Sequence, residues 1–145
     1  MTTFRMGPTA SRMIGLYALV AVHGWFVLEY AYPSAGEQLA LALSVLKISG
    51  LLATAIFVMG TFGAMAYAAD RELDERELAQ RNSAFVRAYE YLFVMLLLQS
   101  VIPEGVAKLL NTELTVTFMQ DFVLLLFATA FVLPGFLLAW RARRD

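Results

Sequence analysis

Cysteine is absent from this chain, and charged residues are scarce. Without cysteine the chain has no disulfide, no thiolate metal site and no thiol nucleophile. Charged residues make up 16% of the 145 residues, whereas a soluble domain carries roughly a quarter. Because 60% of the residues are hydrophobic and the mean hydropathy is +0.66, the composition predicts an integral membrane protein.

Four apolar stretches are long enough to cross a lipid bilayer, since a span needs about 20 residues of helix. Their approximate ranges are residues 13–32, 39–69, 84–102 and 115–140. The second stretch is over-long and must tilt or protrude. Between the third and fourth, the segment "PEGVAKLLNTEL" has apolar residues at helical spacing, which predicts a short interfacial helix. The sequence therefore predicts an all-α integral membrane four-helix bundle that forms one transmembrane domain over residues 1–145.

Arginine placement predicts how the four spans are oriented, because cytoplasmic segments carry the excess of Lys and Arg. Nine arginines fall on one side of the predicted spans, and the opposite side has only Lys108, while Lys47 lies within the second span. We therefore expect both termini in the cytoplasm, with the chain in the inner membrane of a bacterium or archaeon. The nine arginines that would share the cytoplasmic side are Arg5, Arg12, Arg71, Arg76, Arg81, Arg87, Arg141, Arg143 and Arg144.

The densest charge lies in "DRELDERELAQRNSAFVRAY", residues 70–89, and we name residues 70–83 the charged hairpin. Asp74 followed three residues later by Glu77 is typical of a capping box, so the third helix is expected to begin there. The hairpin has two open interpretations: it only sets topology, or it docks a cytoplasmic protein. Because residues 70–82 hold five acids against three arginines, direct nucleic-acid binding is disfavoured. The docking residues would be Asp74, Glu75, Arg76, Glu77 and Arg81.

The hairpin resembles that of a known family. The run Asp74-Glu75-Arg76-Glu77, followed by Leu78, Arg81, Ala84, Ala88 and Tyr89, is similar to the "DERD/DERE" hairpin of small four-span membrane proteins of bacteria and archaea, a domain of unknown function of the DUF2178 kind. The resemblance covers about twenty residues, the number of spans and the basic C-terminal end. It implies a companion of small helix-turn-helix regulators, and thus a membrane-bound modulator of transcription.

Ionisable residues inside spans are functional candidates, because charge in a bilayer is costly unless it is paired or hydrated. We expect an outward-facing polar cavity for a ligand or ion, with Glu29 and Lys47 as its closest pair. That pair could equally be a structural bridge between helices. With one histidine and no cysteine, one chain cannot supply bis-His haem ligation or a Cys/His zinc site, so no cofactor or metal is expected. The cavity residues would be His23, Glu29, Lys47, Glu104 and Asp121.

Small residues in the second span form two pairs at helical spacing, Gly50/Thr54 and Gly60/Ala64, which allow close helix approach within one chain or between chains. No nucleophile–base pair or phosphate-binding glycine loop is present in the sequence, so catalysis is disfavoured. We expect a non-enzymatic regulatory or sensory membrane protein. The alternatives are a homo-oligomeric small transporter or channel, and an accessory subunit of a larger membrane complex.

Overall fold

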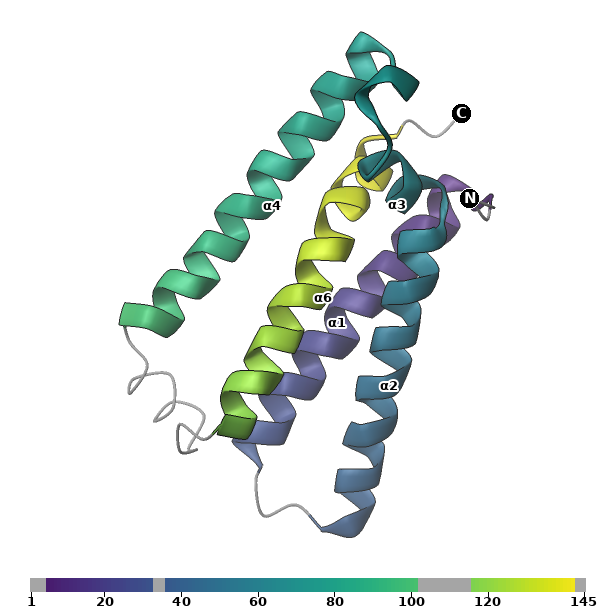
Figure 1. Cartoon of the computed structure of the whole chain (residues 1–145). Coiled ribbons are helices and arrows are strands. Elements are labelled where there is room, and N and C mark those ends of the chain that lie inside the picture. Colours follow the sequence, from purple (N-terminus) through teal and green to yellow (C-terminus); the bar gives the residue numbers. More distant parts are fainter. Residues whose placement is uncertain (1–4, 33–35, 102–115, 143–145) are drawn as a thin grey trace.

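The computed structural model describes residues 5–32, 36–101 and 116–142, except for the side chains of residues 99–101. This part of the chain is all-helical (Figure 1). The interfacial helix predicted before the fourth span lies outside the described residues. The elements in chain order are α1 (Pro8–Ala31), α2 (Glu37–Met59), α3 (Thr61–Ala66), the short 3-10 helix η1 (Asp70–Glu72), α4 (Glu75–Val101) and α6 (Val116–Arg141).

The four long helices run alongside one another, with α6 next to α1 and to α4 (Figure 1). Helix α1 begins and α6 ends at the same end of the molecule, where α3, η1 and the start of α4 also lie. We name this the hairpin end, and the opposite end, where α1 ends and α6 begins, the distal end. Helix α4 packs mainly against α6 and is the most peripheral of the four.

Helices α1 and α2 approach closely because small residues face each other. A Cβ at Gly50 would lie 3.0 Å from the Cβ of Ala21 and 3.0 Å from a methyl group of Val22. The Thr54 hydroxyl donates to the Gly50 carbonyl at 3.0 Å, inside its own helix. The close approach predicted at Gly50 is therefore confirmed, and it serves packing within one chain.

The second predicted span, residues 39–69, is not one helix. Helix α2 ends at Met59, and α3 follows after a single extended residue, Gly60. A Cβ at Gly63 would lie 2.5 Å from the carbonyl oxygen of Phe57, a contact that real side chains do not make. The over-long apolar run is therefore divided at Gly60, and the absence of a side chain at Gly63 lets α3 lie against the end of α2.

Helix α6 continues through Pro134. Proline has no N–H, so the carbonyl of Ala130, four residues earlier, has no helical donor. The Tyr67 hydroxyl lies 3.1 Å from this carbonyl and 3.1 Å from that of Phe131. A side chain from outside the helix thus supplies the missing donor, which is how a proline is tolerated where water is scarce.

Three helices in the described part of the chain are long and apolar enough to cross a membrane: α1, α2 and α6. The chain therefore has the composition and helix lengths of a membrane protein. Helix α4, which contains the predicted third span, is long but carries charges in its first sixteen residues, the last of them Arg87 and Glu90. Its small buried residues Ala84 and Ala88 pack toward α6, where Leu138 joins Ala84 in one cluster.

Candidate functional site

An ion pair joins α2 to α6 near the distal end. The Lys47 ammonium donates to the Oδ1 atom of Asp121 at 3.0 Å. The second carboxylate oxygen of Asp121 accepts a 2.6 Å hydrogen bond from the Tyr30 hydroxyl on α1. The Lys47 nitrogen also lies 4.1 Å from the centre of the Trp25 ring, a cation–π contact. Three helices therefore contribute to one polar cluster, which we name the ion-pair site: Trp25, Tyr30, Lys47 and Asp121.

The α1 side of the ion-pair site is held by aromatic packing. Tyr30 lies edge-on to Phe118 at 4.9 Å between ring centres, and Phe26 lies 5.1 Å from Tyr30. Trp25 and Tyr30 are almost completely buried. Because these rings interlock α1 with α6, the Tyr30 hydroxyl and the Trp25 face have little freedom to move relative to Asp121.

The lysine reaches the carboxylate by extending along the bundle. Lys47 lies ten residues into α2 and Asp121 five residues into α6, or about 15 Å and 8 Å from the distal ends of their helices. The lysine stem must therefore lean toward the distal end, as long basic side chains do in apolar surroundings. The Lys47 side chain remains 32% exposed and that of Asp121 14% exposed, so the rest of the protein covers the pair only in part.

The predicted pairing of Lys47 with Glu29 is wrong. Glu29 is exposed at the surface of α1, while Lys47 bonds to Asp121. Successive residues in a helix point about 100° apart, so when Tyr30 faces α6 its neighbour Glu29 must face elsewhere. Of the two other acids predicted for the cavity, Asp121 does lie beside Lys47, and Glu104 lies outside the described residues.

His23, also predicted to join the cavity, instead connects α1 with α4. Its Nδ1 atom lies 2.8 Å from the Leu19 carbonyl, and because a carbonyl only accepts, this nitrogen carries the proton. In the neutral ring Nε2 then accepts from the Tyr91 hydroxyl at 3.0 Å. Among the residues that the structure describes, no three His, Asp or Glu side chains gather closely enough to hold a metal ion.

At the opposite end, the charged hairpin contains the predicted capping box. The backbone N–H of Glu77 donates to the Asp74 carboxylate at 2.7 Å, and the N–H of Asp74 donates to the Glu77 carboxylate at 3.1 Å. The Asp74 carbonyl accepts the first helical bond, from Leu78 at 2.9 Å. The prediction that the third helix begins here is confirmed, since α4 starts at Glu75.

Arg81 fixes the hairpin to the body of the protein. Its guanidinium donates to the Ala68 carbonyl at 2.7 Å and forms an ion pair with Asp70. The Arg81 side chain is only 11% exposed because it braces the hairpin, and its role in docking stays a prediction. Of the other predicted docking residues, Asp74, Glu75 and Arg76 are exposed and Glu77 is half-buried.

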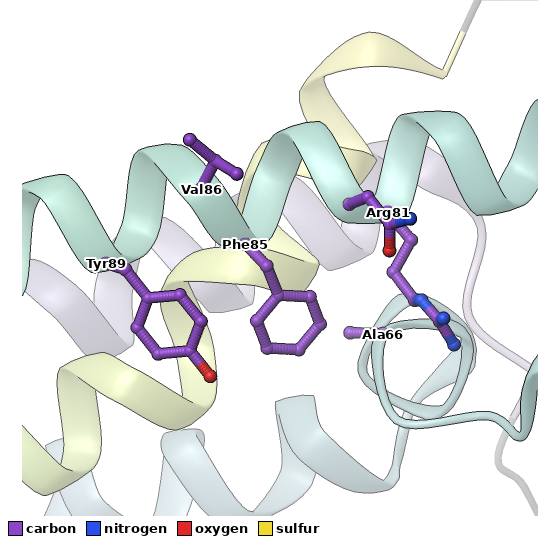
Figure 2. Close-up of a pocket in the computed structure, with 6 residues that line it drawn as sticks. Ala66, Arg81, Phe85, Val86 and Tyr89 are labelled. Atoms are coloured by element: carbon purple, nitrogen blue, oxygen red, sulfur yellow. The ribbon is translucent and has the colours of Figure 1, made fainter.

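A groove of about 480 Å³ runs beside the hairpin, between α3 and α4 (Figure 2). Figure 2 shows the side chains of Arg81, Phe85 and Tyr89 pointing from α4 toward the side on which Ala66 of α3 lies. The groove thus has a polar end near the hairpin and an aromatic end further along α4. Its lining residues are Ala66, Arg81, Asn82, Phe85, Val86 and Tyr89.

Two arginines counted only for orientation prove to join helices at the hairpin end. Arg12 of α1 donates to the carbonyls of Ala139 and Ala142 at 2.8 and 2.5 Å, so it caps the C-terminal end of α6. Its guanidinium also lies 5.5 Å from the centre of the Trp140 ring. Arg141 donates to the Ser83 hydroxyl of α4 at 3.2 Å. A usable signal for Arg12 was present, because a lone arginine near the start of an apolar helix needs acceptors nearby.

Comparison of the chain with protein-family models, with curated proteins and with solved structures finds no match, so its functional assignment rests on the chemistry of the ion-pair site and the charged hairpin.

Proposed function

We propose that this chain is a four-span regulatory protein of a prokaryotic inner membrane, whose charged hairpin docks a soluble cytoplasmic partner. Three helices with the length and composition of spans support the membrane setting. Helix α4 would be a further span, the third along the chain, because its second half exposes large apolar side chains such as Phe93, Val94 and Leu97. The hairpin, the start of α1 and the end of α6 share one end of the molecule, as a cytoplasmic face with nine arginines requires.

The docking role is supported by the charged hairpin, whose backbone is held by hydrogen bonds and an ion pair while several of its charged side chains stay exposed. The capping box and the Arg81–Asp70 pair fix the hairpin without using its outermost side chains. Glu72 and Glu75 therefore project into solvent from a surface that is already ordered. A preorganised surface loses little conformational entropy on binding, which favours a specific protein contact.

The chemistry of the hairpin favours a partner with a basic surface, because its acids outnumber its arginines. The resemblance to small four-span proteins that accompany helix-turn-helix regulators makes a transcriptional regulator our preferred partner. Such a regulator would be held at the membrane through the hairpin, and the chain itself would not contact nucleic acid.

The test is a pull-down of cytosol from the source organism by the purified chain in mild detergent, compared with two charge-neutralised variants. The double variant Glu72→Gln/Glu75→Gln removes exposed charge from the hairpin and leaves the capping box intact. The control Glu29→Gln/Glu37→Gln removes two exposed acids from the distal end. We expect one protein to be retained by the native chain and by the control, and lost from the hairpin variant. Equal retention by all three would refute the docking role.

A homo-oligomeric small transporter or channel is a second candidate, because the Lys47–Asp121 pair lies within apolar helices. Ion flux in liposomes that is lost in Asp121→Asn, together with an oligomer in detergent, would favour it. Isolation of the native chain within a larger complex would instead indicate an accessory subunit. A monomer without flux that still binds its cytosolic partner would support the regulatory role.

A further inference from the structure

We propose that Trp25, Tyr30 and Asp121 form a binding site for a small primary organic ammonium ion, and that Lys47 occupies this site as a tethered ligand of the chain itself. The inference concerns the distal end of the bundle. It does not depend on what the charged hairpin binds.

The walls of the site exist without the lysine. Asp121 is oriented by the 2.6 Å bond from Tyr30, and Tyr30 and Trp25 are both buried on α1. Tyr30 packs edge-on against Phe118, which joins α1 to α6, and Leu43 of α2 packs into the same cluster, so the carboxylate and the indole face are held by contacts that do not involve the Lys47 ammonium. A site that is already formed binds its ligand with little loss of conformational entropy.

Lys47 is the only member of the site contributed by α2, and it is the most flexible. Its ammonium ends a four-carbon stem and its side chain is 32% exposed, whereas Trp25 is 2% exposed and Tyr30 8%. A lysine ammonium is a compact, strongly hydrated charge that can leave a partly open site for water. The carboxylate and the ring would stay behind, facing the space that the ammonium has left.

The recognition chemistry specifies the ligand. A carboxylate oxygen at 3.0 Å accepts an N–H donor from the ammonium, and an aromatic face at 4.1 Å attracts its positive charge. A primary alkylammonium satisfies both contacts as Lys47 does, while a neutral amine or alcohol lacks the charge that both contacts use. Asp121 lies about 8 Å from the start of α6 and the Lys47 side chain is 32% exposed, so the proposal places the entry of the ligand where Lys47 reaches the protein surface.

Lys47 competes with a free ammonium through its effective concentration, which is on the order of millimolar for a short flexible tether. A free alkylammonium must therefore exceed this concentration to displace the lysine in the native chain. Removing the ammonium while keeping most of the stem, as in Lys47→Met, should lower the apparent Kd roughly tenfold or more.

The experiment uses the full chain in detergent micelles with Trp140→Phe, so that Trp25 is its only tryptophan. n-Butylammonium chloride, which reproduces the end of a lysine side chain, is titrated at neutral pH while Trp25 fluorescence is recorded. n-Butanol controls for apolar partitioning into the micelle, and sodium chloride controls for ionic strength. The chains compared are the Trp140→Phe protein, its Lys47→Met derivative and its Lys47→Met/Asp121→Asn derivative.

We expect a saturable fluorescence change with n-butylammonium in the first two chains, about tenfold tighter in Lys47→Met, and none in the double derivative. Neither n-butanol nor sodium chloride should reproduce it. A response that persists without the Asp121 carboxylate, or that is confined to Lys47→Met, would overturn the proposal. If Lys47→Met is poorly folded, n-butylammonium should raise its melting temperature while n-butanol does not, and failure of this rescue would also overturn the proposal.

Discussion

Loss of the Asp121 charge should destabilise the protein substantially, because it leaves the Lys47 ammonium without its carboxylate. Asp121→Asn keeps the size of the side chain and retains an oxygen that can accept from Tyr30. The perturbation therefore removes the ion pair and leaves the packing between α1 and α6 in place. Breaking a fully buried pair costs about 3–5 kcal/mol, whereas an exposed pair contributes about 0–1 kcal/mol.

The exposed fractions of the two side chains place this pair between those limits. With 14% exposure at Asp121 and 32% at Lys47, we expect Asp121→Asn to lower the free energy of unfolding by about 2–3 kcal/mol. Lys47→Met should cost less, about 1–2 kcal/mol, because Tyr30 still satisfies one carboxylate oxygen of Asp121. The two losses should not add, since each variant already removes the same pair.

The assay is reversible unfolding of the purified chain in mixed micelles of dodecyl maltoside and increasing sodium dodecyl sulfate, followed by circular dichroism. The double variant Lys47→Met/Asp121→Asn should be more stable than the sum of the single losses predicts, by about 1–2 kcal/mol. Glu29→Gln, which changes an exposed acid on α1, should stay within about 0.5 kcal/mol of the native chain. Additive single losses would refute the conclusion that the pair stabilises the contact between α2 and α6.

Three further changes test other contacts. Asp74→Ala removes one half of the capping box and should destabilise the start of α4 by about 1 kcal/mol, measured as faster amide hydrogen exchange in its first turn; unchanged exchange would contradict the capping role. Tyr67→Phe should lower the free energy of unfolding by about 1 kcal/mol in the same micelle assay. The same change should cost little in a Pro134→Ala background, where the restored backbone N–H of residue 134 donates to the Ala130 carbonyl. An equal cost in both backgrounds would contradict the conclusion that the Tyr67 hydroxyl replaces this N–H. Arg12→Met should lower the free energy of unfolding by about 2 kcal/mol, because two charged hydrogen bonds at the end of α6 are lost. An equally large loss in Arg12→Lys would show that a positive charge at this position does not by itself preserve these hydrogen bonds.

Local and periodic patterns determined much of the architecture. Uninterrupted apolar runs predicted α1, α2 and α6, because the length of apolar helix needed to cross a bilayer is fixed by its thickness. Asp74 and Glu77 predicted the start of α4, since a capping box forms between residues three apart and needs no tertiary contact. Gly50 was found in the same way, because only very small residues let two helices approach closely.

The pairing of Lys47, by contrast, was decided by the tertiary structure. Its partner Asp121 is 74 residues away, and the choice between Asp121 and Glu29 depends on how α1, α2 and α6 are rotated about their axes. Spacing within one helix shows which residues share a face, but it does not show which face of another helix meets them. The break at Gly60 and the bracing role of Arg81 have the same origin, because both depend on where separate segments come together in space. The sequence by itself thus determined the helices and their starts, and the packing of one helix against another decided which polar groups meet.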